Sequence, residues 1–156
     1  MVLRHLVSIL LLPFTVTVLI PYWLISRYGI GDPAPWVAGG GLLLATIGLA
    51  LLGWCVWLFA RVGRGTLAPW DPTTNLVAAG PYAYVRNPMI SGVLMILLGE
   101  AVYFDASALR WWAIIFLVIN HAYFIFIEEP GLERRFGQAY RAYKTRVPRW
   151  LPRLSK

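Results

Sequence analysis

The chain has 156 residues, of which 59% are hydrophobic and 13% are charged. Soluble domains carry about 25% charged residues, so this composition indicates an integral membrane protein with one domain over residues 1–156 and excludes a separate soluble catalytic domain. The formal net charge is +7, and because the basic residues flank hydrophobic stretches, we expect membrane lipids as their partner and no nucleic acid.

Four stretches of the chain are apolar over lengths near what a helix needs to cross a bilayer, roughly 20 residues. Their limits are about 6–25, 36–60, 89–104 and 109–127. The first follows a basic residue, as in a signal peptide, but it is too long for one and no small-residue cleavage site follows it. The sequence therefore predicts an all-α bundle of four transmembrane helices, the first of them retained.

Lysine and arginine residues are distributed very unevenly between the two ends of this predicted bundle. With both termini on one side, twelve of the fourteen fall on that side, and only Arg27 and Arg110 fall on the other. Cytoplasmic loops of membrane proteins carry the excess of basic residues. We therefore predict a multi-pass membrane protein with cytoplasmic termini. The segments before the third helix and after the fourth are expected at the same face.

The second apolar stretch carries small residues on one helix face. Gly41, Ala45 and Gly48 recur at intervals of four and three, and small residues let two helix backbones approach closely in a membrane. The partner helix lies either in the same chain or in a second copy, so a homodimer is one alternative. The single cysteine, Cys55, can form no intramolecular disulfide, and no Cys/His cluster predicts a metal site.

Polar sequence with a regular apolar stripe follows Pro130. The stripe consists of Leu132, Phe136, Tyr140, Tyr143 and Val147. Spacings of three and four place these residues on one face of a helix, which we predict over about 131–147 and which Pro148 ends. Basic residues occupy the remaining surface. An amphipathic basic helix of this kind either lies in the membrane interface or caps a cavity.

A first polar cluster stands immediately before the third apolar stretch. Arg86 is followed by Asn87 and Pro88, of which proline suits the first turn of a helix and asparagine suits the N-cap position. Arg86 either anchors the helix by extending its guanidinium to the interface, or clamps a carboxylate or phosphate. The clamp is the favoured interpretation because carboxylates end the fourth stretch on the same side.

Those carboxylates are Glu128 and Glu129, which either pair with the basic tail or bind a cationic or hydroxyl-bearing ligand. His121 precedes Glu128 by seven residues, or two helical turns, so both are expected on one face as a cavity wall. A purely structural histidine is the alternative. Glu100, toward the opposite side, is expected to be structural, within reach of Arg110, or to mark the far end of a lipid groove.

Three segments together resemble a known family. They are Gly80-Pro81-Tyr82-x-Tyr84-Val85-Arg86-Asn87-Pro88, then Glu128-Glu129-x-x-Leu132-x-x-x-Phe136-Gly137-x-x-Tyr140-x-x-Tyr143, and finally Val147-Pro148-Arg149-Trp150-Leu151-Pro152. The pattern, spread over roughly residues 60–153, resembles the isoprenylcysteine carboxyl methyltransferase superfamily. The membrane phospholipid N-methyltransferases have a related layout.

The resemblance implies an integral membrane methyltransferase that holds S-adenosylmethionine between its last spans and its C-terminal segment. Its substrate would be lipophilic or lipid-anchored and would enter from the bilayer. The implied cofactor-binding residues are Tyr82, Tyr84, Val85, Arg86, Asn87, Pro88, Glu128, Glu129, Leu132, Tyr140 and Tyr143. To these we add His121, from its spacing to Glu128. For catalysis we name Arg86, Glu128 and Arg149, the last of which the resemblance places near cofactor or substrate.

The chain departs from the family pattern at two positions. The family often has histidine where this chain has Asn87 and tyrosine where it has Met89. Asparagine can hydrogen-bond a carboxylate but cannot act as an acid or base at neutral pH. Two alternatives to methyl transfer are a nicotinamide-dependent membrane reductase of sterol-reductase-like architecture and a small transporter or assembly factor.

Overall fold

The computed structural model describes residues 10–63 and 74–152, and every regular element in these ranges is helical. In chain order the elements are η1 (Leu10–Leu19), α2 (Ile20–Tyr28), α3 (Pro35–Leu58), η2 (Phe59–Gly63), η3 (Gly80–Ala83), α4 (Pro88–Tyr103), α5 (Ser107–Tyr123), η4 (Phe124–Glu128) and α6 (Glu129–Arg146). Of these, η1, η2 and η4 are π-helices and η3 is one 3-10 turn. Residues 6–9 of the first predicted span and the basic residues Arg4, Arg64, Arg153 and Lys156 lie outside the described residues.

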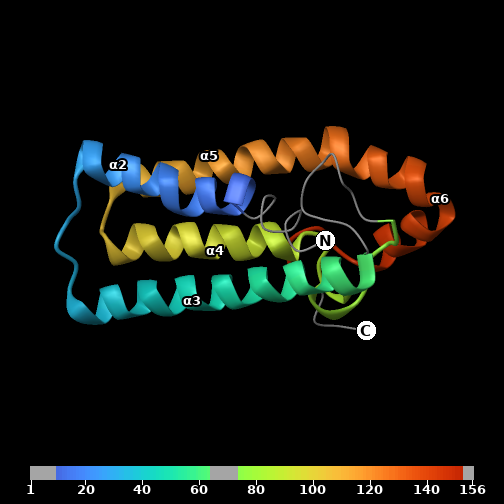
Figure 1. The fold of residues 1–156 in the computed structure, drawn as a ribbon, viewed down its shortest axis with the longest axis horizontal. Coiled ribbons are helices and arrows are strands. Elements are labelled where there is room, and N and C mark those ends of the chain that lie inside the picture. The colour runs from blue at the N-terminus through green and yellow to red at the C-terminus, as the bar shows by residue number, and fades with distance from the viewer. Residues whose placement is uncertain (1–9, 64–73, 153–156) are drawn as a thin grey trace.

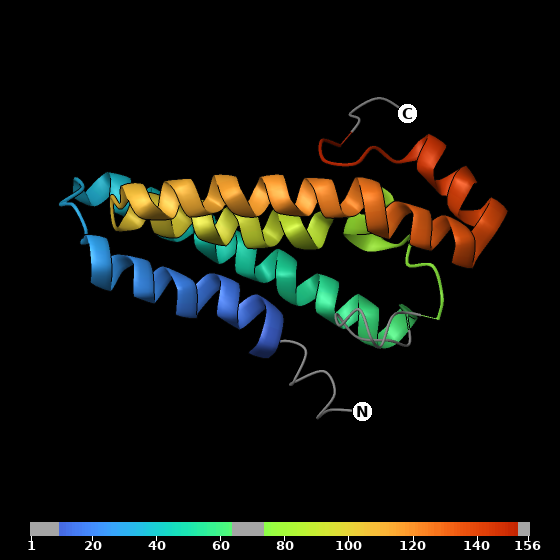
Figure 2. The same cartoon turned by 90° about the horizontal axis from the view of Figure 1, so that it is seen from above.

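Three long helices form the body of the molecule, with α4 packed between α3 and α5 (Figure 1). The arm made of η1 and α2 packs on α5 through α2 and on α4 through η1. The two short connections, from α2 to α3 and from α4 to α5, lie together at one end of the bundle (Figure 1). At the other end α6 turns back on itself (Figure 2).

Two helical runs within the described residues are long and apolar enough to cross a membrane. They are Pro35–Gly63, formed by α3 and η2, and Ser107–Arg146, formed by α5, η4 and α6. The apolar sequence of the second run ends at Ile127, and polar residues begin at Glu128. α4 is apolar but shorter. The all-helical architecture is confirmed over the described residues, and the count of four transmembrane helices stays a prediction.

α3 and α4 pack backbone against backbone because their glycines face each other. A Cβ on Gly41 would lie 2.7 Å from the carbonyl oxygen of Gly99, and a Cβ on Gly48 would lie 2.6 Å from that of Gly92. No side chain fits at such distances, so this contact depends on small residues in both helices. Of the two alternatives for the small-residue face, the structure therefore shows packing within the chain. A homodimer would have to use another surface.

The turn between α4 and α5 is closed by Asp105, whose φ is 43°. Aspartate is one of the few side chains that adopt a left-handed backbone with ease. Its carboxylate accepts a hydrogen bond of 2.9 Å from Arg110. The expected contact between Glu100 and Arg110 is therefore wrong, because Arg110 pairs with the nearer Asp105. Glu100 Oε2 is buried without a hydrogen-bond partner among the described residues.

The chain does not break at Pro130, where the sequence predicted a separate helix to begin. α5, η4 and α6 are continuous, and Pro130 occupies the first turn of α6 directly after the wider π-helical turn. Within a continuous helix, the missing N–H of proline leaves a carbonyl of the preceding turn without its helical donor, and the wider π-turn gives the proline ring room beside that carbonyl. The change of direction occurs instead at Gly137, with φ 51° and ψ −124°, a conformation open chiefly to glycine.

The apolar stripe predicted for the C-terminal helix is covered by protein. Its cluster consists of buried Tyr140, Tyr143 and Val147, with Leu76, Leu132 and Phe136 packed against them. A helix lying in the membrane interface would present this stripe to lipid, so its burial favours the capping alternative. α6 ends at Arg146 because Val147 is extended, as the following Pro148 requires.

The contact between α3 and α4 predicts a large difference between two glycine substitutions. Gly99→Ala should destabilise the protein by about 1–3 kcal/mol, because the new methyl group would lie 2.6 Å from the Ala45 backbone nitrogen. Gly40→Ala is the matched control, with no atom within 4 Å of its Cβ. It should leave stability unchanged or raise it by up to ~1 kcal/mol. Thermal unfolding of the purified variants in detergent measures the difference, and equal midpoints would contradict the close packing.

Candidate functional site

Three segments distant in sequence meet where α6 turns back. They are the connection from η3 to α4, the junction of η4 with α6, and the extended residues 147–152 after α6, which we call the C-terminal strap. Gly80 lets the chain turn close beneath α3, since its φ is 58° and a Cβ there would lie 2.9 Å from Leu58. The backbone N–H of Arg86 donates a 2.9 Å hydrogen bond to the Pro148 carbonyl, which ties the first segment to the strap.

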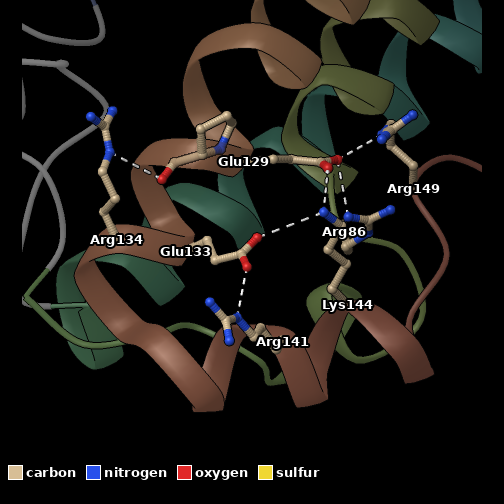
Figure 3. Close-up of polar contacts among 8 residues, drawn as sticks. Arg86, Glu129, Glu133, Arg134, Arg141, Lys144 and Arg149 are labelled. Carbon is tan, nitrogen blue, oxygen red and sulfur yellow. Dashed lines mark hydrogen bonds and ion pairs between the residues drawn. The ribbon is translucent and has the colours of Figure 1, made fainter.

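Glu129 is the centre of this site (Figure 3). Its Oε1 lies 3.0 Å from Arg86 Nη1 and 2.7 Å from Arg149 Nε, while its Oε2 lies 3.5 Å from Lys144 Nζ. We call these four residues the Glu129 cluster. The Glu129 side chain is 7% exposed and that of Arg86 is 11% exposed, so this ion pair is shielded from water. One carboxylate therefore joins cations from three separate segments.

The charge state of Glu129 follows from these contacts. Burial alone would raise the pKa of its carboxyl. The hydrogen bond from Arg149 and the positive charges of Arg86, Arg149 and Lys144 outweigh burial and hold the pKa below its usual value of 4.5. The hydrogen bond to Glu129 also raises the pKa of Arg149. At neutral pH the cluster therefore holds three positive charges around one negative charge.

Two buried hydrogen-bond donors beside the cluster lack partners among the described residues. They are Nε of Arg86 and Nδ2 of Asn87, whose residue is only 7% exposed. Asn87 occupies the N-cap position of α4 as predicted, but its side chain makes no capping hydrogen bond. Leaving a buried donor unpaired costs about 1–3 kcal/mol. Together with the excess positive charge, these donors fit a ligand with an anionic acceptor group.

Three of the four predicted site tyrosines, Tyr82, Tyr140 and Tyr143, are buried and pack beside the Glu129 cluster. Tyr143 donates a 2.7 Å hydrogen bond to the Tyr82 carbonyl, and the Tyr82 ring stacks on Phe59 with centroids 5.5 Å apart. Tyr140 hydrogen-bonds Arg86 and is 2% exposed. Burial raises the pKa of both Tyr140 and Tyr143, so their phenols stay neutral. These contacts hold the backbone of the η3–α4 connection, which carries Arg86, in one position.

The two neighbouring glutamates have different surroundings. Glu129 is saturated with cations, whereas Glu128 is half-buried and makes no hydrogen bond among the described residues, although the charge of Arg135 acts on it. The π-helix η4 explains the difference, because a π-turn contains one residue more than an α-turn and shifts the register of the residues that follow. The carboxylate that meets Arg86 is therefore Glu129 and not Glu128.

His121 lies away from the Glu129 cluster on an exposed part of α5. Its Nδ1 accepts a 3.1 Å hydrogen bond from the indole Nε1–H of Trp150 in the strap. The expectation that His121 and Glu128 share one face assumed a regular helix, which η4 interrupts. His121 thus belongs to the site through the strap and not as a wall beside the acidic pair.

The remaining predicted residues are mostly structural in their placement. Val85 and Pro88 are buried, and Leu132 packs on the tyrosine stripe of α6. Tyr84 is 66% exposed. The structure therefore brings Arg86, Asn87, Glu129 and Arg149 together, with Tyr82, Tyr140 and Tyr143 packed beneath them.

Sequence reasoning missed two residues. Lys144 was assigned to the outer surface of a straight helix, but the kink at Gly137 turns the second half of α6 so that Lys144 reaches Glu129. Trp150 was noted only as part of the family pattern. The spacing of apolar residues does not predict the φ angle of a glycine inside a helix. The presence of Gly137 is the one sequence feature that indicates the bend.

Comparison with known proteins identifies the family. Residues 37–139 match the phospholipid methyltransferase family, which covers α3, α4, α5 and the beginning of α6. A stretch of 63 residues is 38% identical to an uncharacterized protein of Haemophilus influenzae, covering 40% of this chain and the whole of that protein.

The chain therefore belongs to the phospholipid methyltransferase family, whose members are membrane methyltransferases related to the isoprenylcysteine carboxyl methyltransferases. The suspected resemblance is thereby confirmed. The family and the two long apolar helical runs together indicate a membrane protein.

The Glu129 cluster predicts a strong asymmetry between two acidic residues of α6. Glu129→Gln should destabilise the protein by about 3–5 kcal/mol, because it leaves three cations facing one another at a buried site. Glu133→Gln is the control: its partners Arg141 and Lys144 are more exposed, and the loss should stay below ~1 kcal/mol. Chemical or thermal unfolding of both variants provides the comparison, and similar losses would refute the central role of Glu129.

The lowered pKa of Glu129 predicts an acid-dependent loss of stability. A depressed pKa in the folded state contributes stability that is present above the unfolded value of 4.5 and is lost as the pH falls through the folded value. The unfolding midpoint of the wild-type protein should therefore drop as the pH is lowered below the unfolded pKa of 4.5. Glu129→Gln should show a shallower drop over the same range. Parallel curves for the two proteins would contradict this assignment.

Proposed function

We propose that this protein transfers a methyl group from S-adenosylmethionine to a lipophilic substrate that enters from the bilayer, with the cofactor held at the cytoplasmic face. The observation that carries the proposal is the pair of buried, unpartnered donors, Arg86 Nε and Asn87 Nδ2, beside a cation-rich cluster. The family supports methyl transfer over the reductase and transporter alternatives.

The residues of the site fit the groups of this cofactor. Its carboxylate requires donors, which Arg86 and Asn87 offer. Its ammonium and ribose hydroxyls require acceptors. Glu129 is already committed to three cations. Glu128, which is half-buried and has no hydrogen bond with any other described residue, is therefore the carboxylate that we assign as the acceptor. When bound, the cofactor supplies an electrophilic methyl carbon on a sulfonium.

The chain's own residues then have three tasks. The Glu129 cluster holds the strap and the start of α4 in one arrangement, which orients whatever Arg86 and Asn87 bind. The packed tyrosines exclude water from beneath the site. Asn87 cannot remove a proton, so a nucleophile that loses one requires another acceptor. We assign that role to Glu128, which neighbours Glu129 in the chain and has no hydrogen bond within the described residues. A carboxylate nucleophile would need no base.

Access for a lipophilic substrate is supported by the surface next to Glu128. Phe126 is 76% exposed and Ile127 is 56% exposed at the polar end of the apolar run. Because Phe126 and Ile127 directly precede Glu128 in the chain, their exposed side chains offer a lipophilic substrate a path from the lipid to the site. The cytoplasmic position is supported by the uneven distribution of basic residues, most of which share the predicted side of the Glu129 cluster.

Ligand binding tests the cofactor assignment. Isothermal titration of the purified protein with S-adenosylhomocysteine should show binding, and Asn87→Ala and Arg86→Ala should each weaken it at least about tenfold, or ~1.4 kcal/mol. Asn87→Ala is the more specific variant because Nδ2 of Asn87 has no hydrogen-bond partner among residues 10–63 and 74–152 that the substitution would remove. Arg110→Ala, at the opposite end of the bundle, is the control. Absence of binding by the wild type, or equal binding by the Asn87 variant, would defeat the assignment.

The substrate is identified by its product. Incubation with a labelled methyl donor and a lipid extract of the host should label a lipophilic species, and Asn87→Ala should reduce the labelling in proportion to its loss of cofactor affinity. Labelling only of water-soluble compounds would contradict a substrate that enters from the bilayer.

A further inference from the structure

The C-terminal strap runs back from α6 alongside α5 (Figure 2). It contacts the proposed cofactor site through its backbone and through Arg149. The Pro148 carbonyl accepts the Arg86 backbone N–H at 2.9 Å. The next residue, Arg149, donates to Glu129 at 2.7 Å. A molecule that reaches the buried donors of Arg86 and Asn87 therefore comes within contact distance of the strap.

The strap is anchored at both ends. At its start, Val147 is 8% exposed within the tyrosine cluster of α6. At its other end, the Trp150 indole donates to His121 Nδ1 at 3.1 Å and packs edge-on against Phe124, with centroids 5.9 Å apart at 82°. Leu151 is 81% exposed, so Trp150 is the outermost fixed residue of the strap in the described part of the chain.

The donor and acceptor in this outer contact are unambiguous. Indole Nε1–H can only donate, so Nδ1 of His121 must be the acceptor and carries no proton. Within the described residues, the side-chain hydrogen bond of His121 and Trp150 is the one that they make with each other, and neither side chain bonds a member of the Glu129 cluster. Both act on the site through Arg149, which stands next to Trp150 in the chain.

We propose that His121 and Trp150 form a latch that holds the strap, and with it Arg149, over the cofactor site, so that opening of this latch sets the rate of cofactor exchange. The proposal rests on the proposed function and assigns to both residues a positioning role. Release of Trp150 leaves the strap held by Val147, by the Pro148 carbonyl on the Arg86 N–H and by the ion pair of Arg149 with Glu129. Without its outer anchor the strap opens when these inner contacts break, and Arg149 then leaves Glu129. The nucleoside part of the ligand can then enter or depart without disruption of the helical bundle.

The first experiment tests the latch without any ligand. Hydrogen–deuterium exchange of the full-length protein in lipid nanodiscs reports on the Arg86 amide, which is protected by the Pro148 carbonyl. Trp150→Phe keeps the aromatic contact with Phe124 and removes the indole donor, and His121→Phe removes the acceptor. Each should raise exchange of this amide and of peptides covering 147–152 about five- to tenfold, as expected for loss of one hydrogen bond. The double variant should add little.

The matched control is Trp111→Phe, a tryptophan that is 65% exposed at the opposite end of the bundle. It should leave exchange of the strap unchanged. Unchanged strap exchange in both latch variants would overturn the latch. Equal increases along α3, α4 and α5 would also overturn it, because they would show general destabilisation.

The second experiment tests control of exchange. Stopped-flow measurement with S-adenosylhomocysteine should show dissociation about five- to tenfold faster in Trp150→Phe and His121→Phe, with association also faster, so that Kd changes less than either rate. An unchanged dissociation rate despite a mobile strap would overturn the gating role. If the wild type fails to bind this ligand, the proposed function fails, whereas the ligand-free exchange measurement still decides whether the latch exists.

Discussion

The carboxylate of Glu129 is the interaction on which the candidate site depends. It joins Arg86 before α4, Lys144 after the kink of α6, and Arg149 in the C-terminal strap, which are segments with no other charged contact in common among the described residues. Glu129 is the one member of the cluster whose removal leaves the other charges uncompensated, because Arg86, Lys144 and Arg149 would then face one another without a carboxylate between them. Glu129 therefore sets both the relative positions of the three segments and the charge balance of the site.

The helical body provides the rigid support for this cluster. Glycines at the contact of α3 with α4 bring the two backbones together, and α4 begins at Pro88 immediately after Arg86 and Asn87. The position of the two buried donors is thus set by a helix that cannot slide outward without opening its glycine contact. The strap and α6 complete the site from the opposite side, where the chain can rearrange more easily because fewer residues are buried there.

Several features of the site were predictable from residue types and spacing. The tyrosine stripe of α6, the convergence of a basic segment with an acidic pair, and the small-residue face of α3 all follow from helical periodicity and composition. Which glutamate meets Arg86 did not follow. A single π-turn changes the register by one residue, and its formation depends on how the end of α5 packs and not on any local pattern.

The sequence by itself determined the membrane character, the helical class and the family, because apolar length and a spaced set of glycine, proline, tyrosine and charged residues are properties of the chain order. The tertiary structure alone decided that Glu129 is the shared carboxylate, that Lys144 joins it, and that Trp150 reaches His121 across 29 residues. These contacts depend on the continuation of the helix through Pro130 and its bend at Gly137. The backbone conformation at Pro130 and Gly137 depends on how distant segments pack, and the periodicity of the sequence does not describe that packing.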